Sequence, residues 1–403
     1  MTPTPPIPFY RQRELFDLSA ELVRRREAAP VSRVRFPMGS ISVPVWLVTR
    51  YRDAREVLGD AALYSNSFDR MAEHLAETLG ERAAAQMADI APGPLVAADP
   101  PEHTRLRRVL TPAFTVKRMR RLQPRVEQIV VEHLDAMAAR GGPVDLVDSF
   151  ALPVPSLVIC ELLGVPYADR ADFQKRGAVQ LDRSRGHDER ASAGAESRSY
   201  MAELVRMKRS DQGGDLLSML VLDHGDALSD ADLIGIGTLL LLAGHETTAS
   251  MLALSTLLLL EHPDQWATLR EDPANASRAV EELLRHLSIV HHPGIRTALQ
   301  DTMIGEHHIA AGDMVLCSIP SANRDPILAG DTFDITRKPS GHLAFGHGIH
   351  HCVGAPLARM EMQAALPELA SRFPTLRLAV SPDELTFRAD SIVYGVQSLP
   401  VDW

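Results

Sequence analysis

One short glycine-rich stretch near the C-terminal end guides the interpretation of the whole sequence. It reads Phe345-Gly346-His347-Gly348-Ile349-His350-His351-Cys352-Val353-Gly354. Glycines allow tight turns with open backbone N–H groups, and a helix-forming run follows from Ala355. Such a loop can hold a thiolate at a fixed point, where it suits a soft centre such as haem iron. An isolated cysteine in this place is more simply explained as a cap on the following helix. Whether Cys352 is a cap or a ligand therefore depends on the motifs in the rest of the chain.

The composition is that of a large folded protein. The 403 residues are 45% hydrophobic and 23% charged, which is enough to bury an extensive core and too apolar for disorder. Aromatic residues make up only 5%, whereas Leu and Ala are plentiful, and this favours helix. The formal charge is 42 − 52 = −10, which argues against a protein that binds nucleic acid.

The cysteines and the apolar runs indicate the cellular setting. Cys160, Cys317 and Cys352 form no CxxC pair, so neither a disulfide framework nor a zinc site is indicated, and a reducing cytoplasm fits. Residues 1–8 lack the basic-then-apolar pattern of a signal peptide. The apolar run over 233–242 is too short to span a membrane. We therefore expect a soluble, cytoplasmic protein that is monomeric and does not bind membranes.

The hydrophobic pattern predicts a mainly helical chain with a small β part. Residues 31–36 and 41–49 are expected to form a hairpin around a turn at 37–40. Helical patterns dominate elsewhere, without internal repeats or a flexible linker. The expected class is mainly α (α+β), as a single domain over 1–403, with the β part drawn from about 30–50, 294–320 and 376–403.

The longest predicted helix runs from Ser229 to about Glu261. Ser229 is a good cap, and Asp232 follows three residues later as in a capping box. The helix is apolar on most faces, so it should pass through the core. Glu246 and Thr247 lie midway along it. Polar groups there cost stability unless they are satisfied or have a task.

Other expected helices carry paired polar residues. Asp99 is expected to cap a helix on which His103 and Arg107 share one face. Glu282 and Arg285 lie one turn apart on a later helix. Taken singly, the first pair also fits a solvated face and the second a surface ion pair. The further helices are expected over 18–27, 51–59, 116–139, 274–287 and 355–372.

In their order along the chain, these motifs resemble those of the cytochrome P-450 haem-thiolate monooxygenases. The order is His-x-x-x-Arg, Ala-Gly-x-Glu-Thr, Glu-x-x-Arg and Phe-x-x-Gly-x-x-x-Cys-x-Gly, between Asp99 and Arg359. The likeness is strongest to soluble actinobacterial members that tailor secondary metabolites. It implies the cytochrome P-450 fold, with a large helical domain, a long central helix and a small β-rich part.

The resemblance implies a haem b site. Cys352 would be the axial ligand of the iron, and its electron donation favours O–O cleavage. Four residues would hold the two haem propionates, since cationic forks and rings suit carboxylates. Those four are His103, Arg107, Arg296 and His350. The remaining haem-binding residues implied are Ala243, Gly244, Phe345, Gly346 and Gly354.

The resemblance also assigns the catalytic and supporting residues. Thr247 would hydrogen-bond dioxygen or an adjacent water, and Glu246 would relay protons from solvent. Gly244 would leave room for dioxygen. Glu282 and Arg285 would have a structural role, tying their helix to the coil that precedes the cysteine loop. Either Arg324 or Arg337 would complete that pair.

The expected reaction is insertion of one oxygen atom from O2 into an apolar small molecule, by hydroxylation or epoxidation. A polyketide, macrolide or terpenoid natural product is the expected substrate. Electrons would come from NAD(P)H through a ferredoxin and its reductase, because the chain has no room for its own redox module. Arg105, Arg108 and Arg359 would form a basic docking face. The residues expected to contact substrate are Leu240, Ala243, Val290, Ile392 and Val393.

Two other functions compete with this one. A haem-thiolate peroxygenase would use hydrogen peroxide, but the intact Glu246–Thr247 pair counts against it. A non-catalytic haem-binding or sensor protein would not need that pair either. The sequence also carries no DNA-binding or signalling segment that a sensor would use.

Overall fold

The computed structural model describes residues 7–38, 41–80, 94–181, 186–210, 213–225, 227–389, 391 and 393–403. The chain forms two compact units. Unit 1 comprises Met1–Arg105, Arg278–Cys352 and Arg388–Tyr394, and unit 2 comprises Leu106–Ser277, Val353–Phe387 and Gly395–Trp403. The chain passes between them within two helices, α6 (Glu102–Leu110) and α14 (Ala276–Leu287), directly after Cys352, and twice more near the C-terminal end, after Phe387 and after Tyr394. The expectation of a single domain stays a prediction.

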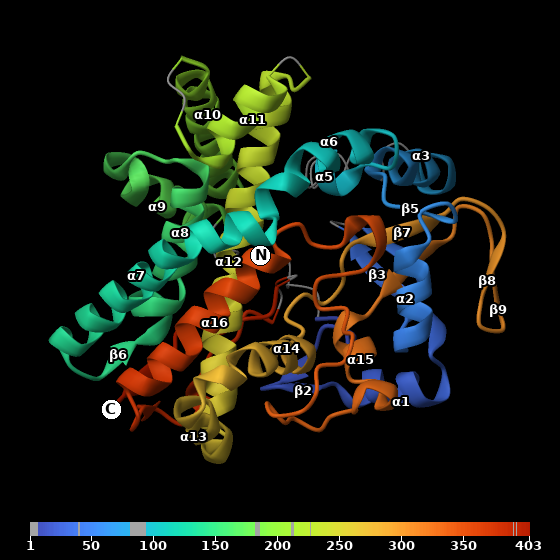
Figure 1. Ribbon diagram of the computed structural model, residues 1–403. Coiled ribbons are helices and arrows are strands. Elements are labelled where there is room, and N and C mark those ends of the chain that lie inside the picture. The colour runs from blue at the N-terminus through green and yellow to red at the C-terminus, as the bar shows by residue number, and fades with distance from the viewer. Residues whose placement is uncertain are drawn as a thin grey trace. The chain divides into compact units, whose positions relative to one another are not determined.

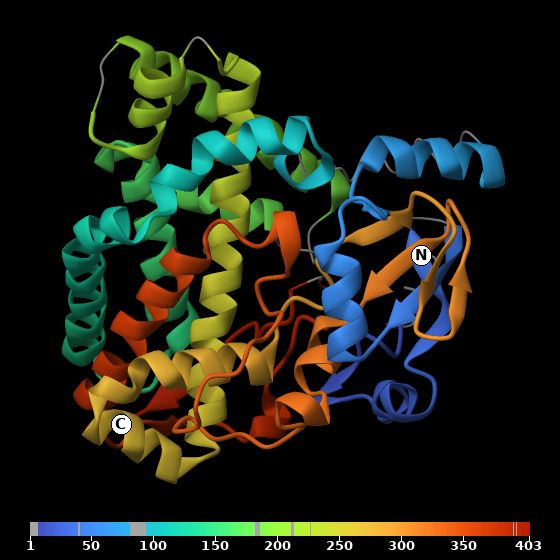
Figure 2. The same cartoon turned by 45° about the vertical axis from the view of Figure 1, so that its right-hand side comes forward.

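Unit 1 is built on a five-stranded sheet in the order β3-β4-β10-β7-β5. The strands are β3 (Val31–Met38), β4 (Ile41–Val48), β5 (Tyr64–Ser65), β7 (Ile295–Ala298) and β10 (Met314–Cys317). β4 and β10 run parallel, and the other neighbours are antiparallel. Figure 2 shows β3 and β4, in blue, beside the orange strands from the later part of the chain.

Side chains that point alternately to the two faces of this sheet are buried on both faces. Leu47 and Leu316 belong to one apolar cluster together with Ile295. Val315 and Cys317 belong to another, with side chains of α2 (Tyr51–Gly59). Because successive side chains in a strand point to opposite faces, a continuous apolar run such as β10 is expected where both faces are covered.

The remaining elements of unit 1 are short. The helices are α1 (Ala20–Ala28), α3 (Phe68–Leu79), α5 (Pro94–Ala97) and α15 (Ile319–Asn323). Two small hairpins pair β1 (Arg13–Glu14) with β2 (Asp17–Leu18) and β8 (Thr302–Ile304) with β9 (His307–Ile309).

Unit 2 is organised around α12 (Asp230–Leu260), the long helix seen in Figure 1. Ser229 and Asp232 form the predicted capping box, in which each side chain accepts a hydrogen bond from the other residue's backbone N–H. The 31 residues give a helix about 46 Å long. It packs against α8 (Pro153–Leu163), α10 (His187–Ser210) and α16 (Ala355–Arg372).

Four further helices and a small sheet belong to the described part of unit 2. The helices are α7 (Val116–Arg140), α9 (Arg170–Leu181), α11 (Leu216–His224) and α13 (Pro263–Glu271). A three-stranded sheet has the order β11 (Arg377–Leu378), β12 (Pro400–Asp402) and β6 (Val144–Asp145).

The predicted elements agree closely with those observed. The hairpin, α2, α7, α12 and α16 lie where the sequence places them, within one or two residues at each end. One detail is wrong. Asp99 does not cap α6, because its carboxylate accepts hydrogen bonds from Ser65 Oγ at 2.5 Å and Asn66 N at 2.9 Å. No helix among the described residues has the length and apolar character needed to cross a membrane.

Candidate haem-thiolate site

The cysteine loop of unit 1 holds Cys352 at its exposed end. The Cys352 N–H donates to the Phe345 carbonyl at 2.9 Å, which closes the loop. Gly346 and Gly348 both have φ of +72°, a left-handed conformation that favours glycine. A Cβ on Gly348 would also lie 2.4 Å from the Leu58 carbonyl oxygen at the end of α2. The glycine spacing is therefore required by the path of the backbone.

Exposure distinguishes Cys352 from the other two cysteines. Cys160 and Cys317 are buried, whereas Cys352 is exposed, and none of the three is in a disulfide. Burial raises the pKa of the Cys160 thiol and of the Cys317 thiol to about 12. These two side chains therefore stay protonated and enclosed, and Cys352 is the thiol placed to ligate a cofactor.

Arg296 on β7 provides a buried positive charge in unit 1. Its side chain is 3% exposed, and its Nη1 donates to Asn66 Oδ1. In the described part of the chain no carboxylate lies within ion-pair distance of it. Burial lowers the pKa of the guanidinium, while Cys317 and Asp99 act in the opposite direction. A buried guanidinium is stabilised by a nearby anion, and a haem propionate would be such an anion.

His103 and His350 lie next to each other in the same unit. Their ring centroids are 4.2 Å apart and their planes are tilted by 51°. The backbone N–H of His103 donates to the Asp99 carbonyl at 3.0 Å, and the Asp99 carboxylate accepts a hydrogen bond from the backbone N–H of Asn66. Asn66 in turn contacts Arg296, so a chain of hydrogen bonds links two of the predicted propionate partners.

These residues fit haem b. Unit 1 brings together an exposed thiol, a buried guanidinium that lacks a carboxylate and two adjacent imidazoles, and the loop's Phe345 and Gly346 accompany them. This donor set suits an iron porphyrin with two carboxylates. Arg107 and Gly354 belong to unit 2, as do Ala243 and Gly244, and their roles toward the haem stay predictions.

In unit 2 the middle of α12 is open along one side. Ala243 is exposed and Thr247 partly exposed, although the residues around them are mostly buried. The Thr247 hydroxyl donates to the Ala243 carbonyl at 2.6 Å. Its oxygen lone pairs are thus left to accept a hydrogen bond. Glu246, directly before it, is buried with 9% exposed.

Gly244 has a packing role that the sequence did not reveal. A Cβ there would lie 2.6 Å from Ile159 Cδ1 on α8. The missing side chain therefore admits α8 close to α12. This packing does not test whether Gly244 also leaves room for dioxygen, which stays a prediction.

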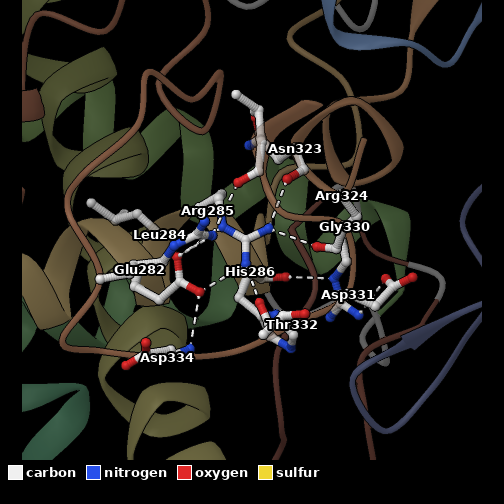
Figure 3. A network of polar contacts seen from close by, with 12 residues as sticks. Glu282, Leu284, Arg285, His286, Asn323, Arg324, Gly330, Asp331, Thr332 and Asp334 are labelled. Atoms are coloured by element: carbon white, nitrogen blue, oxygen red, sulfur yellow. Dashed lines mark hydrogen bonds and ion pairs between the residues drawn. The ribbon is translucent and has the colours of Figure 1, made fainter. Parts of the chain in front are cut away.

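Glu282 and Arg285 form a buried ion pair in unit 1, shown in Figure 3. Arg285 is 1% exposed and Glu282 3%. Arg285 Nε and Nη2 each donate to a Glu282 oxygen at 2.8 Å. The other three N–H groups of Arg285 donate hydrogen bonds to the carbonyls of Asn323, Gly330 and Thr332. All five guanidinium donors are therefore used, as a buried arginine requires.

The structure decides between the two arginines proposed to complete this pair. Arg337 Nη1 lies 3.6 Å from Glu282 Oε2 and also donates to the Leu328 carbonyl at 3.0 Å. Arg324 instead donates to the carbonyls of His286 and Phe16 and pairs with Asp331 at 3.2 Å. Arg337 is the partner.

The residues expected to contact substrate are only partly described. Val290 and Val393 are both partly exposed and form an isolated β-bridge in unit 1. Leu240 on α12 is 6% exposed. Ile392 lies outside the described residues. The role of all of these toward a substrate stays a prediction.

Sequence reasoning missed the residues that support the site. Asn66 and Asp99 hold Arg296 and His103, and Asn323 connects Arg285 to the segment before the cysteine loop. Asp99 was expected only as a helix cap, and Asn66 and Asn323 belong to no spaced motif and have partners far away along the chain. No sequence signal available here could have found them.

Comparison with known proteins gives the family. The family model "Cytochrome P450" matches residues 184–384. Cytochrome P-450 105C1 of a Streptomyces species is 47% identical over 100% of both chains. Cytochrome P-450-SU2 of Streptomyces griseolus is 44% identical, covering 96% of this chain and 94% of its own. The chain belongs to the cytochrome P-450 family.

The fold agrees with a solved member of the family. The structure of OxyE, a cytochrome P-450 involved in teicoplanin biosynthesis, matches with a TM-score of 0.89 and 39% identity, over 99% of this chain and 100% of OxyE. The predicted fold class and enzyme class are thus confirmed. As in the family, the protein is a haem b monooxygenase whose electrons derive from NAD(P)H through redox partners.

Cysteine reactivity should separate the proposed ligand from the other two thiols. Iodoacetamide at about pH 8 should modify Cys352 in haem-free protein and spare Cys160 and Cys317, whose raised pKa keeps them protonated. Added haem should protect Cys352. Peptide mass spectrometry measures each site, with Cys352→Ala as the control. Equal labelling of Cys352 with and without haem would contradict the assignment.

Proposed function

We propose that the protein hydroxylates or epoxidises an apolar natural product, with electrons supplied by a ferredoxin and its reductase. The observation that carries this proposal is the exposed Cys352 at the end of a loop fixed by glycines, in the unit that holds Arg296. When bound, haem b would activate dioxygen, so that one oxygen atom goes to the substrate and the other leaves as water with two electrons and two protons. Cys352 would hold the iron, and His103, Arg107, Arg296 and His350 would hold the propionates.

Proton handling is assigned to the open side of α12. The Thr247 hydroxyl donates to the Ala243 carbonyl, so its oxygen can accept a hydrogen bond from a water. Glu246 adds a carboxyl group one residue earlier, suited to exchange protons with solvent. We assign Thr247 the placement of the proton and Glu246 its delivery.

The proposed substrate is apolar. Leu240, Ala243, Val290 and Val393 offer hydrocarbon or small surfaces. Burial lowers the pKa of His291 well below its ordinary value and that of His292 to about 4. A lowered pKa leaves both rings neutral at pH 7, so this segment adds no imidazolium. OxyE, one of the structural neighbours, is involved in teicoplanin biosynthesis, which supports a natural product as substrate.

The proposed electron donor is an acidic ferredoxin that docks on basic side chains. The net charge of −10 makes a local basic surface necessary for such a partner. Arg108 is exposed in unit 2, as are Lys117, Arg120 and Arg121 in the first turns of α7. Arg105 is a weaker candidate, because it pairs with Glu102 at 2.7 Å.

We also propose a cytoplasmic location and a monomeric state. Three cysteines without a disulfide suit a reducing compartment. Gel filtration of the haem-loaded protein over a range of concentrations tests the monomer, and a dimer would refute it.

Thr247→Ala should uncouple oxygen activation from product formation. With a substrate chosen by its spectral shift, product per NAD(P)H should fall by about tenfold and peroxide should rise, because the proton is no longer placed. Thr256→Ala is the matched control, since its hydroxyl likewise bonds the carbonyl four residues earlier, at 2.9 Å. Unchanged coupling in Thr247→Ala would refute the role of Thr247 in placing the proton.

Charge reversal should weaken ferredoxin docking. Arg108→Glu and Arg120→Glu should each raise the KM for ferredoxin about tenfold at low salt and flatten the salt dependence of turnover. Arg140→Glu serves as control, because Arg140 ends α7 some 30 Å along the same helix from Arg120. Equal effects of all three substitutions would exclude a docking site at the start of α7.

A further inference from the structure

Asn323, the last residue of α15, is fully buried and uses both its side chain and its carbonyl. Its Nδ2 donates to Ser288 Oγ at 2.7 Å. Its Oδ1 accepts from the Leu343 N–H at 2.7 Å. Its carbonyl accepts from Arg285 Nη1 at 2.9 Å, as Figure 3 shows. One residue therefore joins two separate segments of unit 1, the end of α14 with the residue that follows it and the start of the cysteine loop.

The Leu343 contact fixes the start of the cysteine loop. Leu343 is 1% exposed, and its carbonyl accepts from the Gly346 N–H at 2.8 Å. Gly346 turns the chain with its positive φ, and the Cys352 N–H then returns to Phe345. The position of the thiol is thus set by a short series of bonds that begins at the Asn323 amide.

The Ser288 contact fixes the segment that leads from α14 to Arg296. Ser288 has φ of +41°, which is strained for a residue other than glycine. Its hydroxyl donates to the Arg285 carbonyl at 2.8 Å and accepts from Asn323. The strained turn is therefore held on both sides, by the helix that it leaves and by the Asn323 amide.

An amide suits this position because it carries a donor and an acceptor on a short side chain. Aspartate keeps the acceptor for the Leu343 N–H. Leucine has a similar size and offers neither group. The donor and the acceptor can therefore be tested separately in a buried site where each unmade bond is costly.

We propose that Asn323 is a positioning residue of the haem-thiolate site: its side-chain carbonyl holds the start of the Cys352 loop, and its amide nitrogen holds the turn that leads to Arg296. The Glu282–Arg285 pair holds Asn323 in place through the backbone carbonyl. This inference rests on the proposed role of Cys352 as the iron ligand.

The test follows thiolate ligation in haem-loaded protein held at one elevated temperature. The red-shifted Soret band of the reduced CO complex reports the thiolate, and far-ultraviolet circular dichroism reports helix in the same sample. In Asn323→Leu the band should decay about tenfold faster than in the wild type while the helical signal persists. Asn323→Asp should decay within about twofold of the wild type, because it retains the acceptor.

Ser288→Ala is the matched control, since it removes the partner of the amide nitrogen together with the hydroxyl's bond to the Arg285 carbonyl, and leaves the Leu343 contact intact. The red-shifted Soret band of Ser288→Ala should decay more slowly than that of Asn323→Leu. If Asn323→Leu yields no folded holoprotein, Asn323→Ser is judged by the same comparison, because its hydroxyl is too short to reach Leu343. A band that decays only together with the helical signal, or as slowly as in the wild type, would overturn the proposal. A wild type without the red-shifted band would instead refute the role of Cys352.

Discussion

The buried ion pair between Glu282 and Arg285 is the interaction on which unit 1 depends. A guanidinium that is 1% exposed is tolerated only because all five of its N–H groups have acceptors. Two of those acceptors are carbonyls of the coil between α15 and the cysteine loop, and a third is the carbonyl of Asn323, which ends α15. The coil has little regular structure of its own, so Arg285 gives it a shape that its backbone alone would not keep.

A second constraint acts in unit 2, where a long helix has to be buried and yet remain open at one place. The capping box at Ser229 and the close packing against α8 at Gly244 secure α12. In the middle turns of this fixed helix, Ala243 is exposed and Thr247 is partly exposed. The fold thus offers a polar hydroxyl on a rigid element, which suits a group that has to place a proton.

The sequence predicted the residues whose chemistry demands a particular side chain. A thiolate loop needs Cys352 with glycines around it, and a buried helix with an acid and an alcohol is conspicuous among apolar residues. Supporting residues gave no such signal. Asn323 and Asn66 act through partners that become neighbours only in the folded chain, and asparagine is common in loops for many reasons. Arg324 and Arg337 lie in the same coil, and only their coordinates distinguish them.

The central claim is that Cys352 ligates the haem iron. The most direct measurement is the reduced CO difference spectrum of the wild type and of Cys352→His at equal haem content. We predict a strongly red-shifted Soret band in the wild type and its complete loss in Cys352→His, where an imidazole replaces the thiolate. A red-shifted band that persists in Cys352→His, or that is missing from the wild type, would contradict it.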